Sequence, residues 1–302
     1  MIKPILVVGS AALDTVETPA GRRDNILGGS SFFFSTAASR FSPVRLVAVI
    51  GSDFPLAQLD FMTKRNVDLS GLETQEGETF RWGGRYFEDP NQRETLFTKL
   101  GVFERFEPKI PDHFKDSPIV FLGNIHPKLQ LNVLEQIRDP ELVVLDTMNF
   151  WIQGVPDLLE NVISKTNVLI INDEESFQLT NQHNILSASE NLLSRGPHTI
   201  VIKKGQHGAV LIRQDGDIFI IPAFPVRKVI DPTGAGDTFA GGFVGYLASQ
   251  DLRHPQSWRK AMAYGAIVAS YVVEDFSMER TKILRREEID GRLELHRKMT
   301  AF

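Results

Sequence analysis

The amino-acid sequence predicts an α/β fold, a doubly wound and mostly parallel sheet flanked by helices, with a small β lid. Two observations predict the sheet. Short β-branched runs recur along the 302 residues, and segments with helical periodicity separate most of them. The runs are continuously apolar, which is typical of strands buried on both faces of a parallel sheet. A third observation, one segment that breaks the alternation, predicts a hairpin and hence the lid.

The predicted strands are apolar runs, in chain order Ile5 to Gly9, Val44 to Gly51, Ile119 to Gly123, Leu142 to Asp146, Val168 to Asn172 and Thr199 to Lys203. The predicted crossover helices are Pro127 to Arg138, Pro156 to Ser164, Asp173 to Leu179 and Ser187 to Arg195. In open parallel sheets, ligands bind beyond the carboxyl ends of the strands. The polar residues that we expect to line one crevice there are Asn124, Asp146, Asn149, Asn172 and Lys204.

The segment from Glu78 to Phe106 does not follow the alternation of strands and helices. Two runs rich in aromatic and β-branched residues flank the turn Asp89-Pro-Asn-Gln92, which predicts a hairpin. With the polar stretch from Asp14 to Ile26, this hairpin would form a small antiparallel lid across the ligand edge of the sheet. We expect one domain, 1–302, with a lid formed by about 12–27 and 78–106. The alternative is a surface hairpin without function.

Composition excludes several classes of protein. With 33 basic and 38 acidic residues the net charge is −5, which provides no electrostatic footprint for nucleic acid or an anionic membrane. The chain has no cysteine, so disulfides, thiolate metal sites and cysteine nucleophiles are excluded. No apolar run approaches 18 residues, and the first strand is too short for a signal peptide. We therefore expect a cytoplasmic protein.

The residues Asp231-Pro-Thr-Gly-Ala-Gly-Asp237 place a glycine turn at the start of a predicted helix. Apolar residues follow at the spacing of an amphipathic helix, at Phe239, Ala240, Phe243, Val244 and Leu247. The backbone N–H groups of Gly234, Ala235, Gly236 and Asp237 would lack helical acceptors, and the helix dipole adds roughly half a positive charge. The turn is therefore a candidate site for a phosphate group.

Asp237 has two interpretations. A carboxylate in a first helical turn interacts favourably with the dipole and needs no other role. Its helical neighbours, however, are Gly241 and Gly245, so its face of the helix would allow a ligand to approach closely. In that case Asp237 would accept a proton from a substrate hydroxyl, while the N–H groups of the turn stabilise charge on a transferred phosphoryl group.

Gly28-Gly29 precedes a second predicted helix, which begins at the N-cap Ser30 and ends before Ser42-Pro43. The two glycines would let a ligand approach the backbone, although such a pair is usually only a turn. The phenylalanines at positions 32 to 34 span almost a full helical turn. They cannot all face the core, so we expect at least one to face the crevice or the lid.

Asn172-Asp-Glu-Glu175 lies where a predicted strand enters a helix. Its side chains could hold hydrated Mg²⁺ through water, the mode that this ion prefers when it also binds phosphates. The alternative is a capped helix with acidic residues in its first turn. The seven histidines are scattered without metal-ligand spacing, and we assign them no metal role.

With these motifs in this order, the chain resembles the ribokinase-like (PfkB) family of carbohydrate and nucleoside kinases over nearly its whole length. The signature runs from Asp231 to Phe243. Supporting motifs are Gly9-Ser10 with Asp14, Gly28-Gly29, Gly51-Ser-Asp53, Asn172-x-x-Glu175 and Lys204-Gly-Gln-His-Gly208. Two other phosphate cradles, the Walker A sequence and the Gly-x-Gly-x-x-Gly fingerprint, are missing from the sequence.

The resemblance implies roles for the residues that match the family pattern. Asp237 would be the catalytic base, and Gly234, Ala235 and Gly236 would form an anion hole. Substrate would contact Asp14, Gly28, Gly29, Phe33, Asn124 and Trp82. ATP would lie near Asn172, Lys204, Gly205, Gly208, Thr233, Gly236, Ala266 and Ser270, the last two within the helix from Ala261 to Tyr271. Glu175 and Asn172 would hold Mg²⁺ through water, and Asp231 would adjoin a candidate site for a monovalent cation such as K⁺.

Departures from the family pattern bear on the substrate. Sugar-specific relatives often place an asparagine four residues beyond the second glycine, where this chain has Phe33. With Trp82, Tyr86 and Phe97 in the lid, the acceptor pocket is expected to be more apolar than a hexose site, which favours a nucleoside or a ring-bearing polyol. The other interpretation is that these aromatic residues pack the lid or a dimer contact. Asp146-Thr-Met-Asn149 also departs from the usual Asp-x-Asn arrangement.

We therefore predict an ATP- and Mg²⁺-dependent kinase that phosphorylates a hydroxyl, expected to be a primary one, of a sugar, nucleoside or related small molecule. Positioning and charge neutralisation would carry most of the catalysis, and lid closure would exclude water. Apart from its small-molecule substrates, the candidate partner is a second copy that binds through the lid. One alternative is a non-catalytic regulatory module that binds nucleotide or sugar on the same fold. Another is a dehydrogenase, which the missing dinucleotide fingerprint disfavours.

Overall fold

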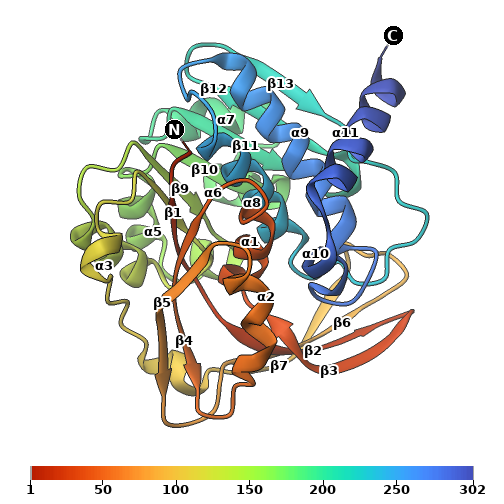
Figure 1. Cartoon of the computed structure of the whole chain (residues 1–302). Coiled ribbons are helices and arrows are strands. Elements are labelled where there is room, and N and C mark those ends of the chain that lie inside the picture. The colour runs from red at the N-terminus through yellow and green to blue at the C-terminus, as the bar shows by residue number, and fades with distance from the viewer. Residues whose placement is uncertain (1, 302) are drawn as a thin grey trace.

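The computed structural model describes residues 2–301, and within them the strands form two sheets (Figure 1). The large sheet has nine strands in the order β13-β12-β11-β10-β9-β8-β1-β4-β5. Their bounds, in chain order, are β1 Ile5–Val8, β4 Val44–Gly51, β5 Val67–Gln75, β8 Ile119–Leu122, β9 Leu142–Asp146, β10 Val168–Asn172, β11 Thr199–Lys203, β12 Ala209–Arg213 and β13 Ile218–Ile221. Within the described residues, β12 pairs antiparallel with both β11 and β13 and the other pairs of this sheet are parallel, so the predicted mostly parallel sheet is confirmed.

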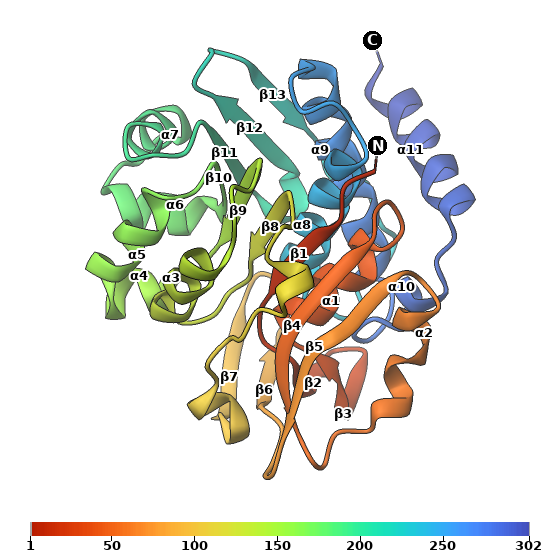
Figure 2. The ribbon, with the colours of Figure 1, turned by 60° about the vertical axis from the view of Figure 1, so that its left-hand side comes forward.

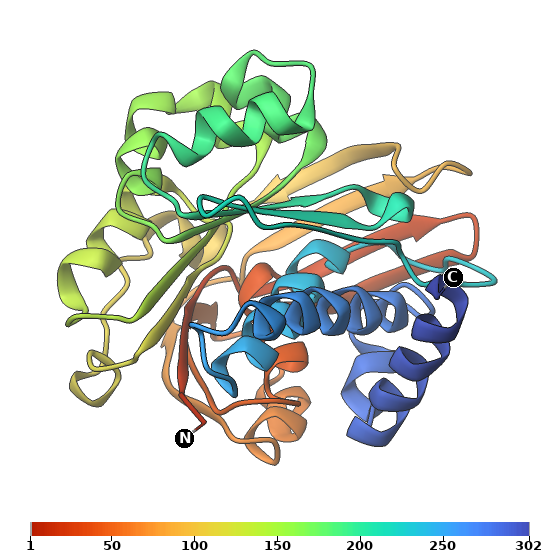
Figure 3. The ribbon, with the colours of Figure 1, turned by 90° about the horizontal axis from the view of Figure 1, so that it is seen from above.

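Helices cover both faces of the large sheet (Figure 3). The helices are α1 Ser30–Ala38, α2 Asp60–Thr63, α3 Pro127–Gln136, α4 Asn149–Gly154, α5 Pro156–Ile163, α6 Asp173–Thr180, α7 Ile185–Leu193, α8 Ala235–Ala248, α9 Pro255–Val272, α10 Glu279–Ile283 and α11 Arg286–Thr300. Among the described residues, no helix combines the length and the apolar character that crossing a lipid bilayer requires.

Alternate residues of each buried strand enter separate hydrophobic cores, because successive side chains of a strand point to opposite faces. In β1, Ile5 and Val7 pack with residues of α1, α8 and α9, whereas Leu6 and Val8 pack with residues of α3, α5 and α7. Figure 2 shows the green helices on one side of the sheet and the blue helices on the other. This double burial explains why the strands read as continuous apolar runs.

The small sheet consists of two hairpins, and its strands are β2 Ala12–Thr18, β3 Gly21–Gly28, β6 Arg81–Tyr86 and β7 Arg93–Lys99. Each hairpin is antiparallel, but β2 and β6 pair in parallel where the hairpins meet. The expected small sheet is therefore confirmed, although it is mixed rather than wholly antiparallel. The reason is that β2 continues from β1 and β6 continues from β5, and both parent strands of the parallel sheet run in the same direction.

The three phenylalanines of α1 correct another expectation. Phe32, Phe33 and Phe34 are all buried in the same hydrophobic core, so the expectation that they cannot all face the core is wrong. The Phe34 ring stacks on Phe121 of β8, and the Phe32 ring lies 5.7 Å from that of Phe54. Because the sheet, α8 and the 51–54 turn surround α1, even a fully apolar helical turn is accommodated in the core.

Candidate active site

The glycine turn lies at the start of α8, as its sequence predicts. Gly234 is the N-cap and has a left-handed backbone, with φ of 72°. A Cβ built on Gly234 would collide with the ring of Phe33, which packs directly beneath the turn. Only glycine combines this backbone conformation with so close a contact. Phe33 thus supports the turn from the core rather than lining an open pocket.

The glycines that follow Asp237 have a structural explanation. A Cβ built on Gly241 would collide with the carbonyl oxygen of Phe34, and one on Gly245 would lie 2.7 Å from the Cα of Ala38. These glycines therefore let α1 and α8 pack backbone to backbone. The expectation that they clear space for a ligand beside Asp237 is wrong.

Asp237 nevertheless belongs to a charged cluster that is largely, but not fully, buried. The Nζ of Lys203, at the end of β11, donates a hydrogen bond of 3.1 Å to Oδ1 of Asp146, at the end of β9. Burial raises the pKa of Asp237 to about 7, the Asp146 carboxylate raises it too, and the Lys203 ammonium opposes the shift. A carboxyl group with such a pKa is suited to accept a proton near neutral pH.

Asn172 and Glu175 form a capping box at the start of α6. Asn172 Oδ1 accepts a hydrogen bond of 2.7 Å from the N–H of Glu175, and Glu175 Oε2 accepts one of 2.8 Å from the N–H of Asn172. This geometry is that of the capped helix, the alternative to a metal site. Burial raises the pKa of Glu175 to about 7, against the attraction of the Lys203 ammonium. The second carboxylate oxygen, Oε1, takes no part in the capping box.

The proposed acceptor residues lie at the junction of the two sheets. Asp14 of β2 is only 4% exposed, and its Oδ1 has no hydrogen-bond partner within residues 2–301. A Cβ built on Gly28 would collide with the Asp14 carboxylate, so this glycine makes room for it. Burial, followed by the charges of Asp231 and Asp237, raises the pKa of Asp14 well above its ordinary value. One oxygen of this buried carboxyl group is thus left without a partner in the described part of the chain, which calls for an explanation.

Three further predicted residues have contacts that explain their position. Asn124 Oδ1 accepts a hydrogen bond of 2.8 Å from the indole of Trp151 in α4. The Trp82 ring covers Gly84 in its own strand. Gly29, with φ of 92°, passes so close to Ser10 that a Cβ would lie 2.5 Å from the Ser10 carbonyl oxygen. Gly29 therefore serves a close backbone contact, and the amide of Asn124 is fixed by α4.

The predicted nucleotide residues fall into two groups. Lys204, Gly205 and Gly208 form the turn between β11 and β12, next to the charged cluster, and both glycines have positive φ. Ala266 and Ser270 are buried in α9. Ser270 Oγ donates to the carbonyl oxygen of Ile267 and accepts a hydrogen bond from Arg292 of α11, so this hydroxyl is already engaged.

Asp231 connects the glycine turn to the segment before α10. Its Oδ1 accepts a hydrogen bond of 2.8 Å from the N–H of Thr233, and its Oδ2 accepts one of 2.9 Å from the N–H of Ser277. The hydroxyl of Ser277 in turn donates to the carbonyl oxygen of Leu27 in β3. Thr233 Oγ1 also lies 3.3 Å from the hydroxyl of Tyr86 in β6. The turn is therefore tied to both hairpins of the small sheet.

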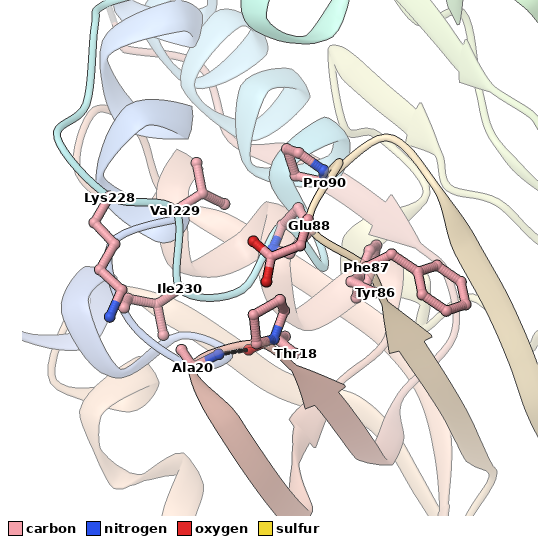
Figure 4. A pocket seen from close by; sticks show the side chains of 11 residues that line it. Thr18, Ala20, Tyr86, Phe87, Glu88, Pro90, Lys228, Val229 and Ile230 are labelled. Atoms are coloured by element: carbon pink, nitrogen blue, oxygen red, sulfur yellow. Dashed lines mark hydrogen bonds between the residues drawn. The ribbon is translucent and has the colours of Figure 1, made fainter.

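A cavity of about 320 Å³ opens between the tips of those hairpins and the loop before the turn (Figure 4). It is lined by apolar and aromatic groups, among them Tyr86, Phe87 and Ile230, and by the charged side chains of Glu88 and Lys228. Figure 4 shows Lys228 and Ile230 on one side, with Tyr86 and Phe87 across from them.

Sequence reasoning missed Lys203 and placed Asp146 only among the polar residues at the carboxyl ends of the strands. The available signal was a lysine that ends a strand of otherwise buried apolar residues, Thr199–Lys203. Such a lysine must lie at the carboxyl edge of the sheet, where ligands bind. The partner of the lysine was not predictable, because Asp146 lies 57 residues away and meets it only through the order of the strands.

Comparison with known proteins identifies the family. A model described as pfkB family carbohydrate kinase matches residues 130–281, which include α8 and the glycine turn. The chain belongs to this family. It is therefore an ATP-dependent phosphotransferase with an alcohol group as acceptor. A kinase of this family uses ATP with a divalent metal ion.

Individual relatives agree with this assignment. The chain is 29% identical to a cytidine kinase of Thermococcus kodakarensis over 82% of its own length and 90% of that protein. It is 28% identical to a nucleoside kinase of Methanocaldococcus jannaschii over 83% and 80% of the two chains. The crystal structure of a nucleoside kinase from that organism superposes with a TM-score of 0.79 at 24% identity, covering 97% of this chain and 99% of that one. A nucleoside kinase of Burkholderia thailandensis in complex with inosine superposes with a TM-score of 0.81 at 20% identity, covering 97% and 98%. The predicted ribokinase-like fold is confirmed.

Proposed function

We propose that this kinase transfers a phosphoryl group from ATP to a hydroxyl group, expected to be the primary one, of a nucleoside. The observation that carries this proposal is the position of Asp237, which lies in the first turn of α8 directly after Gly234, Ala235 and Gly236, partly buried beside Asp146 and Lys203. A base of suitable pKa thus adjoins backbone N–H groups that can receive a phosphate.

In this mechanism Asp237 accepts the proton of the attacking hydroxyl. The N–H groups of Gly234, Ala235 and Gly236 stabilise the negative charge of the transferred group, as in other anion holes. Asp14 binds a second hydroxyl of the acceptor through Oδ1, the sealed oxygen that lacks a protein partner. The second hydroxyl, held at a fixed position, orients the first for attack, and such positioning carries much of the catalysis in phosphoryl transfer.

Within residues 2–301, no three His, Cys, Asp or Glu side chains are grouped as a metal site. A site with few protein donors, such as Glu175 and Asn172, fits Mg²⁺, because this ion keeps several waters and binds few protein groups when phosphates are its other ligands. We propose that Oε1 of Glu175 and the side chain of Asn172 hold the ion through water. When bound, the ion neutralises charge on the phosphates. Asp231 is the candidate for a monovalent cation site, although both of its oxygens already accept backbone hydrogen bonds.

The small sheet is proposed to act as the lid of a single domain, 1–302, with about 12–27 and 78–106 as its segments. Three observations support this role. Asp14 comes from β2, the tyrosine hydroxyl of β6 adjoins Thr233, and the hydrophobic cluster of Val16, Tyr86 and Phe276 seals the base of the sheet against the main body. A closed lid excludes the water that would otherwise hydrolyse ATP. The lid is also the candidate surface for a homodimer.

The acceptor class rests on the relatives and on the composition of the site. The relatives reported above are cytidine and nucleoside kinases, and Phe33 stands where sugar-specific relatives often place an asparagine. The test is a screen of ADP release with Mg-ATP over pentoses, hexoses, inositols and nucleosides. We expect nucleosides to have the highest kcat/KM. A strong hexose preference would contradict the proposed acceptor, and nucleotide binding without turnover on any acceptor would favour a regulatory module.

A further inference from the structure

Lys203 brings a positive charge to the centre of the proposed transfer site. It ends β11, and its side chain is largely buried, with 18% still exposed. The carboxylate that it contacts, Asp146, is more deeply buried, with 6% of its side chain exposed. The lysine therefore reaches the interior of the crevice but retains access to it.

The ammonium group of Lys203 lies against the glycine turn. A Cβ built on Gly236 would lie 3.1 Å from Lys203 Nζ, closer than ordinary van der Waals contact. Gly236 is the residue directly before Asp237 and contributes one of the N–H groups of the proposed anion hole. A phosphoryl group bound at this turn would thus lie beside a fixed ammonium as well as beside backbone donors.

The ammonium group of Lys203 also has N–H donors that its hydrogen bond to Asp146 does not use. A lysine side chain carries three N–H donors, and within the described part of the chain Nζ donates one hydrogen bond, to Asp146. The surrounding charges are mainly negative, because Asp146, Glu175 and Asp237 all face it. Burial lowers the pKa of Lys203, but these three carboxylates outweigh that effect and the pKa is raised. The lysine therefore stays protonated at neutral pH.

An ion pair with Asp146 alone does not account for this arrangement. A structural ion pair needs no access to solvent and no contact with the turn. The anionic cluster, in contrast, would repel the phosphates of a nucleotide unless a cation compensated it. Lys203 is the cation whose charge acts on Asp146, Glu175 and Asp237 alike.

On the basis of the proposed function, we propose that Lys203 is a catalytic residue whose ammonium donates hydrogen bonds to the transferred phosphoryl group. In the transfer step, the acceptor oxygen forms a bond to phosphorus and gives its proton to Asp237. The bond between that phosphorus and the bridging oxygen of ATP breaks, and its electron pair stays with ADP. Lys203 remains protonated throughout and stabilises the negative charge on the oxygens of the phosphoryl group during its transfer. Its hydrogen bond to Asp146 fixes its position.

The experiment compares Lys203→Met, Lys203→Arg and the double variant Asp146→Asn/Lys203→Met with the wild type, at saturating Mg-ATP and the best nucleoside. Lys165→Met serves as the control, since this exposed lysine precedes β10 at the opposite end of the strands. We expect kcat of Lys203→Met to fall about 10²–10³-fold, the range for loss of one transition-state donor. Lys203→Arg is expected to retain more activity, and Lys165→Met all of it.

A binding measurement separates catalysis from folding. Calorimetry would measure ADP alone, and then ADP with fluoroaluminate and the nucleoside, which imitates the phosphoryl group in transfer. We expect Lys203→Met to bind ADP within about threefold of the wild type but to lose at least tenfold more affinity for the fluoroaluminate complex.

The double variant tests the structural alternative. If Lys203 only neutralises Asp146, then Asp146→Asn/Lys203→Met leaves no unpaired charge and recovers at least half of wild-type turnover, which would overturn the proposal. Unchanged fluoroaluminate affinity in Lys203→Met would also overturn it. Failure of the proposed function would be seen differently, as a wild-type protein that releases no ADP with any acceptor.

Discussion

Asp237 is partly buried among charged groups from three other elements, and this environment determines when it can act as a base. Asp146 of β9 and Lys203 of β11 face it, and Asp14 of β2 interacts with it electrostatically. With a pKa of about 7, the carboxyl group is protonated and inactive below that pH. We expect kcat/KM for the nucleoside to rise with pH and to reach half its plateau near pH 7.

Glu175 offers a control for this pH profile, because its pKa is also about 7. Glu175→Gln should lower activity but keep the acidic limb, since Asp237 still titrates. A flat profile between pH 6 and 8 in the wild type would contradict the role of Asp237.

Replacement of Asp237 by asparagine tests the base directly. Asp237→Asn cannot accept the proton, so we expect kcat to fall at least 10²-fold while calorimetry shows nearly unchanged affinity for ATP. A variant that keeps more than about a tenth of wild-type turnover would rule out the base, because general base catalysis is typically worth 10²–10⁴.

The same variant should be more stable than the wild type. The folded pKa of Asp237 is raised from 3.8, so between that value and about 7 the native state binds more protons than the unfolded state. This carboxyl group therefore reduces stability progressively as pH rises through that window. We expect Asp237→Asn to raise Tm by a few degrees at pH 8 and by less at pH 5.

At the scale of elements, the start of α8 depends on the helix beneath it. Gly234→Ala adds a Cβ that collides with the Phe33 ring and imposes strain at a φ of 72°. We expect a loss of about 1–3 kcal/mol of stability by urea unfolding, together with a fall in kcat. The double variant Gly234→Ala/Phe33→Leu should regain part of both, because it relieves the collision but not the strain. Identical effects in the single and double variants would refute the contact.

The hydroxyl groups of Tyr86 in the lid and Thr233 in the glycine turn lie in hydrogen-bond contact. Because this contact would hold the turn in place only when the lid is closed, Tyr86→Phe should raise the ratio of ATP hydrolysis to nucleoside phosphorylation several-fold. Thr233→Val should do the same, and Thr233→Ser should restore the wild-type ratio. The double variant Tyr86→Phe/Thr233→Val should be no worse than either single one, whereas additive effects would show that the groups act independently.

At the scale of the whole molecule, transfer requires the two sheets to enclose both substrates. The strand β7 is exposed along most of its length, and β6 joins it to the rest of the small sheet. We expect amide hydrogen exchange in β6 and β7 to slow at least tenfold when ADP and a nucleoside bind together, but little with ADP alone. Equal protection by ADP alone would argue against a lid that closes on the acceptor.

The sequence by itself determined the class of fold and the reaction. Continuous apolar runs show that the strands are buried on both faces, and a glycine turn before a helix predicts a phosphate site, because both signals are local. Six strands, the hairpin within residues 78–106 and the position of Asp237 at the start of a helix were predictable in this way. The strand β5 was not, because it alternates polar and apolar residues at the edge of the sheet.

Only the tertiary structure decided which residues serve packing and which face the site. Gly241, Gly245 and Phe33 had been expected to face a ligand, but they bring α1 and α8 together. Lys203 had been overlooked, yet strand order places its ammonium between Asp146 and the glycine turn. The physical reason is that contacts between elements depend on strand order and helix approach, which no local pattern encodes. The sequence of a turn can indicate a phosphate site locally, but the charged groups that shift the pKa of its carboxylate come from distant parts of the chain.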